Sequence, residues 1–189
     1  MLEVLAGIVF VLFAISIKLS IFNITVSSII YFALYVLYIT SLFIIGGIDK
    51  ENINIQRSVL IFALLTASCY MTYVCIHNKE AVYTYIIYLM ITILLLFADI
   101  IYTKKRQKQS YIIGCLMLIL YMLVFSDSKI MYFTIVLSIL CIVVKALFKL
   151  LKNKKKSNNQ KKKDEKNPIG FYLCISNILL IILFNFLTI

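Results

Sequence analysis

The chain contains few of the residues that interrupt helices or that build metal and disulfide sites. It has one proline, five glycines and one histidine among 189 residues. Its cysteines form no CxxC pair and lie inside apolar runs, whereas zinc knuckles and disulfide frameworks need clustered or exposed thiols. We therefore expect no metal and no cofactor, and we expect the cysteines to pack as small apolar side chains. They are Cys69, Cys75, Cys115, Cys141 and Cys174.

Polar residues are also scarce. The chain is 63% apolar and its mean hydropathy is +1.01, which excludes the soluble classes and predicts an integral membrane protein. The first apolar run lacks the basic start of a signal peptide, and it has no small-residue cleavage site before Asn23. We therefore expect this run to remain as a first helix.

Seven apolar stretches are candidates to cross a bilayer. A hydrocarbon core of about 30 Å needs about 20 residues of helix, and lipid offers no partner for unpaired backbone groups, so the spans must be helices. The sequence thus predicts an all-α, polytopic membrane helix bundle with a single domain over 1–189. The predicted spans are 2–22, 28–48, 58–76, 82–102, 111–126, 130–150 and 168–188, of which the fifth is short.

The formal net charge is +11, and the basic residues behind it are distributed unevenly among the loops. Of 19 basic residues, two lie between the second and third runs, four between the fourth and fifth, and ten between the sixth and seventh. The other side has only Lys18, Lys79 and Lys129. The positive-inside rule places the three basic loops and the N-terminus in the cytoplasm and the C-terminus outside. We expect the lysine-rich loop at 152–167 to contact anionic lipids, and we expect no nucleic-acid partner.

Two aspartates lie where hydrocarbon is expected. Asp49 closes the second apolar run and Asp99 lies inside the fourth, and an acid at membrane depth indicates a functional site because it is costly there. The two residues are separated by one outward and one inward helix, so both return to the cytoplasmic face. Two carboxylates that share one proton can act as base and acid in aspartic proteolysis, since like charges held close cannot both ionise.

Other interpretations of the ionisable residues remain open. Asp49 can be an interfacial residue that ends a helix, and Asp99 can pair with Lys104 or Arg106. His77 and Cys75 suggest a nucleophile pair, as in a peptide-processing cysteine protease of the quorum-sensing type. However, residues two apart on a helix point to different faces, and the charge bias places His77 outside.

Two motifs resemble those of the type IV prepilin peptidase family of intramembrane aspartyl proteases. The run Ile48-Asp49-Lys50-Glu51-Asn52-Ile53-Asn54-Ile55-Gln56 is similar to the family's first aspartate motif. The run Asn167-Pro168-Ile169-Gly170-Phe171-Tyr172-Leu173 is similar to the motif that opens its last helix. The order of helices and loops also resembles the family over nearly the whole chain.

The resemblance implies a catalytic pair, Asp49 and Asp99, and makes Pro168, Gly170 and Phe171 candidates for substrate binding. It implies a pilin-like precursor as the substrate, cleaved at the cytoplasmic face of a bacterial or archaeal cell membrane. Leu96-Phe97-Ala98-Asp99 stands where the family has Gly-x-Gly-Asp, and Ile101 stands where it has a lysine. The CxxC domain of bifunctional members is missing, so we expect no methyltransferase activity.

The main alternative is a small-solute transporter or a substrate-capture membrane subunit without protease activity. Such a protein is expected to have interrupted helices and polar groups at the middle of the membrane. The two acids of this chain lie at the membrane edge instead, which favours the protease interpretation.

Overall fold

The described part of the chain is entirely helical. The computed structural model describes residues 7, 11, 25–52, 55–106, 110–154 and 167–187, and these contain helices and no strand. The predicted all-α class is therefore confirmed. The helices are α2 (Val26–Asn52), α3 (Arg57–His77), α4 (Ala81–Arg106), α5 (Tyr111–Phe125), α6 (Ser128–Lys154) and α7 (Ile169–Leu187).

The helix boundaries depart from the predicted runs at their polar ends. The structure extends α4 to Arg106 and α6 to Lys154, although the apolar runs stop near 102 and 150. Lysine and arginine are good helix formers, so the helices continue past the hydrocarbon, and the loop predicted from 152 begins later. The predicted first span at 2–22 lies outside the described residues except for Gly7 and Val11, as does the loop over 155–166.

Four of the described helices are long and apolar enough to cross a membrane. They are α2, α3, α4 over Ala81–Lys105 and α6 over Ser128–Phe148. The apolar parts of α5 and α7, Tyr111–Phe125 and Ile169–Phe184, are shorter. Large apolar side chains also stand exposed along the outer faces of α4 and α6, as expected for helices that face lipid rather than water. These features indicate a membrane protein.

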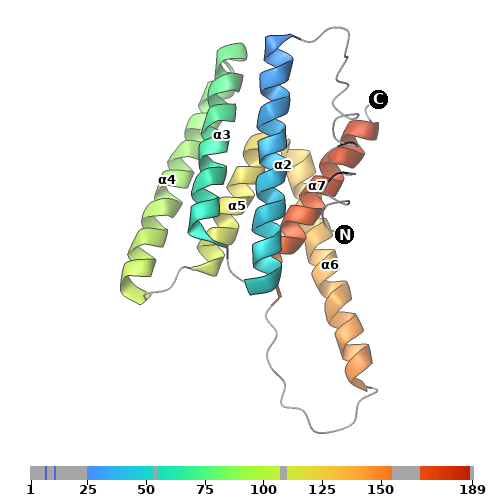
Figure 1. The fold of residues 1–189 in the computed structure, drawn as a ribbon. Helices are drawn as coiled ribbons and strands as arrows, with labels where there is room; N and C mark the ends of the chain where they lie inside the picture. Colours follow the sequence, from blue (N-terminus) through green and yellow to red (C-terminus); the bar gives the residue numbers. More distant parts are fainter. Residues whose placement is uncertain are drawn as a thin grey trace.

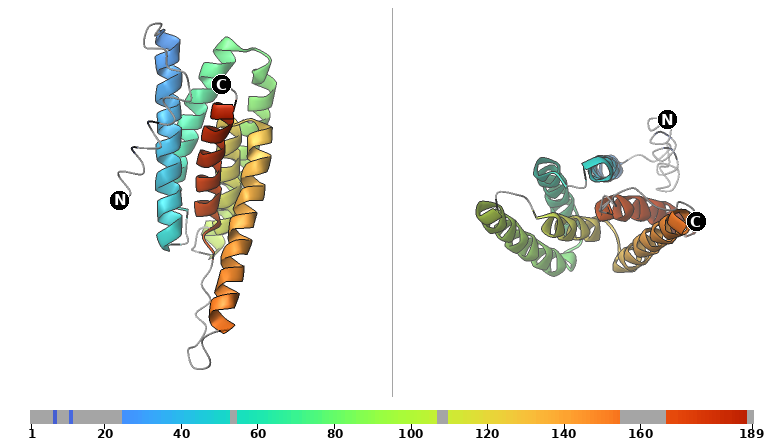
Figure 2. Two further views of the ribbon diagram at one scale, coloured as in Figure 1. Left: turned by 90° about the vertical axis from the view of Figure 1, so that its right-hand side faces the viewer. Right: turned by 90° about the horizontal axis from the view of Figure 1, so that it is seen from below.

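The described helices form a bundle in which successive helices run in opposite directions (Figure 1). Helix α2 packs against α3 and α7, while α6 packs against α7 on the other side. Helix α5 contacts α3, α4 and α7, and it lies near the middle of the bundle when viewed along the helices (Figure 2). This arrangement brings the lower ends of α2 and α4 and the start of α7 to the same end of the molecule.

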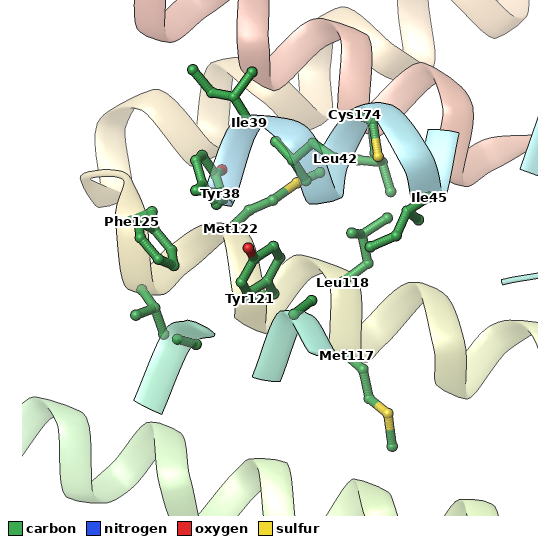
Figure 3. Packing of buried hydrophobic residues seen from close by; sticks show 14 of the residues in the cluster. Tyr38, Ile39, Leu42, Ile45, Met117, Leu118, Tyr121, Met122, Phe125 and Cys174 are labelled. Carbon is green, nitrogen blue, oxygen red and sulfur yellow. The ribbon is translucent and has the colours of Figure 1, made fainter. Parts of the chain in front are cut away.

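An aromatic core joins α2 to α5. The rings of Tyr38 and Phe125 stack with centroids 4.3 Å apart, and the fully buried Leu42 and Met122 lie in the same cluster (Figure 3). The hydroxyl of Tyr38 donates to Asn177 Oδ1 on α7 at 2.5 Å. Hydrogen bonds of this kind hold membrane helices together, because lipid supplies no hydrophobic force between them.

All five cysteines are free. Cys115 and Cys174 are buried in the core, which confirms that these two pack as small apolar side chains, whereas Cys69 is exposed on the outer surface of α3. The exposed position differs from the expected packing because α3 turns that face away from the bundle.

Candidate functional site

Asp49 and Asp99 lie near the same end of the bundle. Asp49 is on α2, Asp99 is on α4, and both helices run toward the lower end in Figure 1. Both residues are buried, with 0% and 4% of their surface exposed. Burial of a carboxylate is costly unless hydrogen bonds or charge compensate for it, so the partners of each acid determine what it can do.

Asp49 is held by the beginning of α7. Its Oδ2 accepts a hydrogen bond from the backbone N–H of Phe171 at 2.9 Å and another from the hydroxyl of Tyr111 at 3.1 Å. The first N–H groups of a helix have no partner within the helix, and the helix dipole favours a negative group there. The N-terminus of α7 therefore binds the Asp49 side chain as it would bind an anion.

Tyr111 links the remaining free donors of α7 to the same carboxylate. Its oxygen accepts from the backbone N–H groups of Ile169 at 2.7 Å and Gly170 at 3.3 Å. The next N–H, of Tyr172, bonds to the carbonyl of Pro168 at 3.4 Å. The start of α7 thus uses Tyr111 and Asp49 as its cap, and the segment that resembles the family's last motif lies directly against the first aspartate.

The three candidate residues for substrate binding all lie at this helix start. Pro168 is buried and directly precedes the first helical residue, where its missing N–H is harmless. Gly170 and Phe171 adjoin the Asp49 carboxylate. The structure therefore brings all three beside one of the two predicted catalytic acids, while their role toward a substrate stays a prediction.

Gly170 allows this close approach because it has no side chain. A Cβ at this position would lie 3.0 Å from Asp49 Oδ2 and 3.3 Å from Ile55 Cδ1. Both neighbours are themselves buried and have little room to move. The glycine is therefore required by the distance between α7 and the carboxylate.

We expect Gly170→Ala to displace α7 from Asp49 and to lower the stability of the folded protein by about 1 to 3 kcal/mol, as overpacking of a filled site typically does. The measurement is the melting temperature of the purified protein in detergent. Gly47→Ala is the matched control, because a Cβ there meets nothing within 4 Å, and it should leave the melting temperature unchanged or raise it slightly. Equal melting temperatures for the two variants would contradict the close-approach argument.

Asp99 has a different partner from those proposed from sequence. Its Oδ2 accepts from Arg57 Nε at 3.0 Å and from Arg57 Nη2 at 2.5 Å. Arg57 Nη2 also donates to Thr103 Oγ1 at 2.7 Å. The ion pair thus joins the start of α3 to α4, and Lys104, one of the expected partners, is exposed. Asp99 pairs with Arg57 because α3 packs beside α4. The pairing with Lys104 that the sequence left open is not seen among the described residues, and the side chain of Arg106 lies outside them.

His77 has a local structural role. Its Nδ1 lies 2.9 Å from the carbonyl oxygen of Tyr73, and its ring lies 4.5 Å from the Tyr73 ring. The residue is exposed at the end of α3 that is opposite to Asp49. This position gives no support to a cysteine–histidine pair at the end that carries the acids.

Each buried acid keeps one carboxylate oxygen without a protein partner. Among the described residues, neither Asp49 Oδ1 nor Asp99 Oδ1 has a hydrogen bond. The hydrogen bonds of their Oδ2 atoms connect the two acids to separate partners rather than to each other. Asp49 is bound by neutral donors, and Asp99 is bound by a cation. Two carboxylates in different electrostatic surroundings can take different roles in acid–base chemistry.

Metal chemistry finds no support in the described ranges, which contain no cluster of three or more His, Cys, Asp or Glu residues able to hold an ion. Comparison with known proteins gives no further guide, since no protein-family model, no curated protein and no solved structure matches this chain. The geometry of the two acids therefore carries the functional argument.

Proposed function

We propose that this chain is an intramembrane aspartyl endopeptidase similar to the prepilin peptidases, which cleaves the leader of pilin-like precursors at the cytoplasmic face of the cell membrane. The proposal includes seven membrane spans with the N-terminus inside. The observation that supports it best is the pair of buried acids, Asp49 and Asp99, at one end of the bundle, each with one oxygen that has no hydrogen bond within the described part of the chain. A buried polar atom without a hydrogen bond calls for an explanation, and a catalytic role is one of them.

In the proposed mechanism, Asp99 carries the charge and Asp49 carries the proton. The guanidinium of Arg57 compensates the Asp99 carboxylate, and this carboxylate takes a proton from the attacking water. Asp49 Oδ2 is already occupied by two donors, so its proton lies on Oδ1 and is given to the scissile carbonyl oxygen. When the C–N bond breaks, the proton held by Asp99 passes to the leaving amine, and Asp49 takes back a proton from one hydroxyl of the tetrahedral intermediate as the carbonyl re-forms.

The proposal includes a closing step. Because the two acids bind separate partners on other helices, a shared proton step requires them to approach each other when substrate binds. Arg57 is 42% exposed at its side chain, so it has room to follow Asp99 toward Asp49 and to keep that carboxylate compensated. The substrate would enter from the same end, where the polar ends of α2 and α4 meet the cytoplasm.

The direct test is co-expression with a panel of pilin-like precursors, followed by a gel shift of the membrane fraction and mass determination of the product. We expect the precursor to lose its leader only when this chain is present. Membranes without the chain serve as the control. Precursors that stay at full length beside normal amounts of the chain would refute the proteolytic function.

Orientation is tested separately, because the mechanism requires the acids to face the cytoplasm. In a version with its five cysteines replaced, a new cysteine at Asn78 should react with a membrane-impermeant maleimide in intact cells. A cysteine at Asn158, in the lysine-rich loop, should react only after the cells are opened. The reverse pattern would contradict the proposed topology, which rests on the uneven distribution of lysine and arginine.

One feature favours a second function, the capture or transport of a small solute. Ionisable residues inside a membrane bundle commonly mark the path of a solute or ion, and the Arg57–Asp99 pair is such a group. If the chain is a transporter, the unaltered protein should cleave no precursor. Asp99→Asn should then change the uptake of the solute. The two functions are thus separated by the cleavage assay itself.

A further inference from the structure

A second site lies on the half of the bundle away from the two acids. A cavity of about 490 Å³ is lined by the first half of α2, the upper parts of α3 and α4, and the turn between α5 and α6. This volume falls in the range of small-molecule sites, which is about 300 to 1,000 Å³. The aromatic residues that line it are Tyr31, Tyr35, Tyr70, Tyr85, Tyr88 and Phe125.

The cavity exists because α5 is short. Its 15 residues extend about 22 Å, whereas the 26 residues of α4 extend about 39 Å. The turn from α5 to α6 therefore lies below the tops of α2, α3 and α4, and Figure 1 shows this step. Ser126 and Asp127, at this turn, line the cavity.

The tyrosine rings surround the space from several directions. The rings of Tyr35 and Tyr70 lie edge to face at 86° with centroids 5.7 Å apart. Tyr31 is tilted by 45° to Tyr35 at 4.7 Å, and Tyr85 and Tyr88 are at 65° to each other on α4. All of these rings line one volume, and the faces of aromatic rings attract a cation with a diffuse charge.

The tyrosines are not simply an aromatic belt at the membrane surface. Belt residues point outward to the headgroups, whereas Tyr35 and Tyr70 are only 9% and 8% exposed. The described residues that line the cavity also include a negative charge and no positive one. Asp127 is its single ionisable acid, and no lysine, arginine or histidine is among the described residues that line it.

We propose that this cavity binds an organic cation of the quaternary ammonium class, held by the tyrosine faces and by Asp127 at the mouth. A quaternary ammonium has no N–H to donate, so ring faces satisfy it better than hydrogen-bond acceptors do. The exposed Asp127 adds long-range attraction that guides the cation to the opening. The ligand comes either as a free solute or as the headgroup of a choline lipid, and both have the same chemistry.

The test uses the full chain in nanodiscs of phosphatidylglycerol and measures the equilibrium binding of radiolabelled choline. We expect saturable binding, and we expect 3,3-dimethylbutan-1-ol, which has the same shape without the charge, to compete at least tenfold less well. Empty nanodiscs are the background. Absence of saturable binding, or equal competition by the neutral alcohol, would overturn the proposal.

Substitutions locate the site. Tyr85→Leu should weaken choline binding about fivefold to thirtyfold, because it removes a ring face, whereas Tyr85→Phe keeps the face and should retain binding. Tyr83→Leu is the matched control, since Tyr83 is on the same helix but 78% exposed and is not a lining residue. A loss of binding with Tyr83→Leu as large as that with Tyr85→Leu would place the ligand elsewhere and refute the proposal.

A second variant tests the site at a position where misfolding is not expected. Asp127 is at an exposed turn, so Asp127→Asn should fold normally and still weaken choline binding severalfold at low salt, with the difference shrinking as salt screens the charge. Unchanged binding in this variant would contradict the role of Asp127. Nanodiscs of phosphatidylcholine then distinguish the sources, because competition by this lipid identifies a headgroup site and its absence identifies a site for a soluble cation.

Discussion

Replacing Asp49 or Asp99 with asparagine is expected to abolish cleavage of a pilin-like precursor by membranes that contain normal amounts of the protein. Asparagine keeps the size of the side chain but removes the titrating proton, so the helices should pack as before. If the two acids act as one unit, each single change should reduce the rate at least about a thousandfold, and the double change should be hardly slower than either. The measurement is the initial rate of leader loss on a gel.

Glu51→Gln is the matched control for this series. Glu51 is an exposed acid two residues after Asp49, and the change from acid to amide is chemically the same. We expect it to leave the rate of cleavage unchanged. Full cleavage by a well-expressed Asp99→Asn protein would refute the dyad and would leave Asp99 as the structural partner of Arg57.

The apolar runs predicted the helices well because hydrophobic length is what lipid selects. The run at 58–76, for example, became α3 at Arg57–His77. The ends were less predictable, since a helix such as α4 continues through Thr103 to Arg106 as long as its backbone bonds form. Hydropathy reports the hydrocarbon boundary, whereas the helix end depends on local hydrogen bonding.

The location of the two acids could be predicted, but their partners could not. Counting helices places Asp49 and Asp99 at one end. Their partners come from other helices, Arg57 at 42 residues from Asp99 and Phe171 at 122 residues from Asp49. Such pairings depend on how each helix is rotated about its axis.

That rotation leaves little trace in this sequence. A helix in water shows an apolar stripe that faces the core, but a helix with apolar residues on all sides gives no periodic signal. Helix α4 illustrates the problem, because most of its apolar residues face outward and Asp99 is the single buried residue among its described side chains. The sequence offers one clue, Arg57 at the first turn of a membrane helix, but its charge is equally explained by the orientation of that helix.

Gly170 and Tyr111 differ in how far the sequence predicts their roles at the site. Gly170 was a candidate through its place in a family-like motif, and the structure gives it a physical reason in its distance from Asp49. Tyr111 belongs to no such motif, yet it joins α5, α7 and Asp49 by three hydrogen bonds. A polar ring at the first position of an apolar run is the only sign of it in the sequence.

Arg57→Leu is expected to cause the largest loss of folded protein among single substitutions at the site. It would leave the Asp99 carboxylate buried without its cation, and removing one partner of a buried pair typically costs 3 to 5 kcal/mol. Because the Arg57 side chain is 42% exposed, we expect a value near the lower end, about 3 kcal/mol. The measurement is the amount and melting temperature of monodisperse protein after extraction in detergent.

The ion pair, rather than the arginine alone, is tested by combining Arg57→Leu with Asp99→Asn. If the damage comes from the uncompensated charge, the second change should restore most of the melting temperature lost in the first, which is the non-additivity of residues in direct contact. Lys104→Leu removes a nearby exposed cation and should have little effect, as surface charges usually do. A loss from Lys104→Leu equal to that from Arg57→Leu, or a double variant less stable than Arg57→Leu, would show that the stability of this end does not depend on the Arg57–Asp99 pair. The compensation of the Asp99 charge by Arg57, which the proposed mechanism uses, would then have no energetic basis.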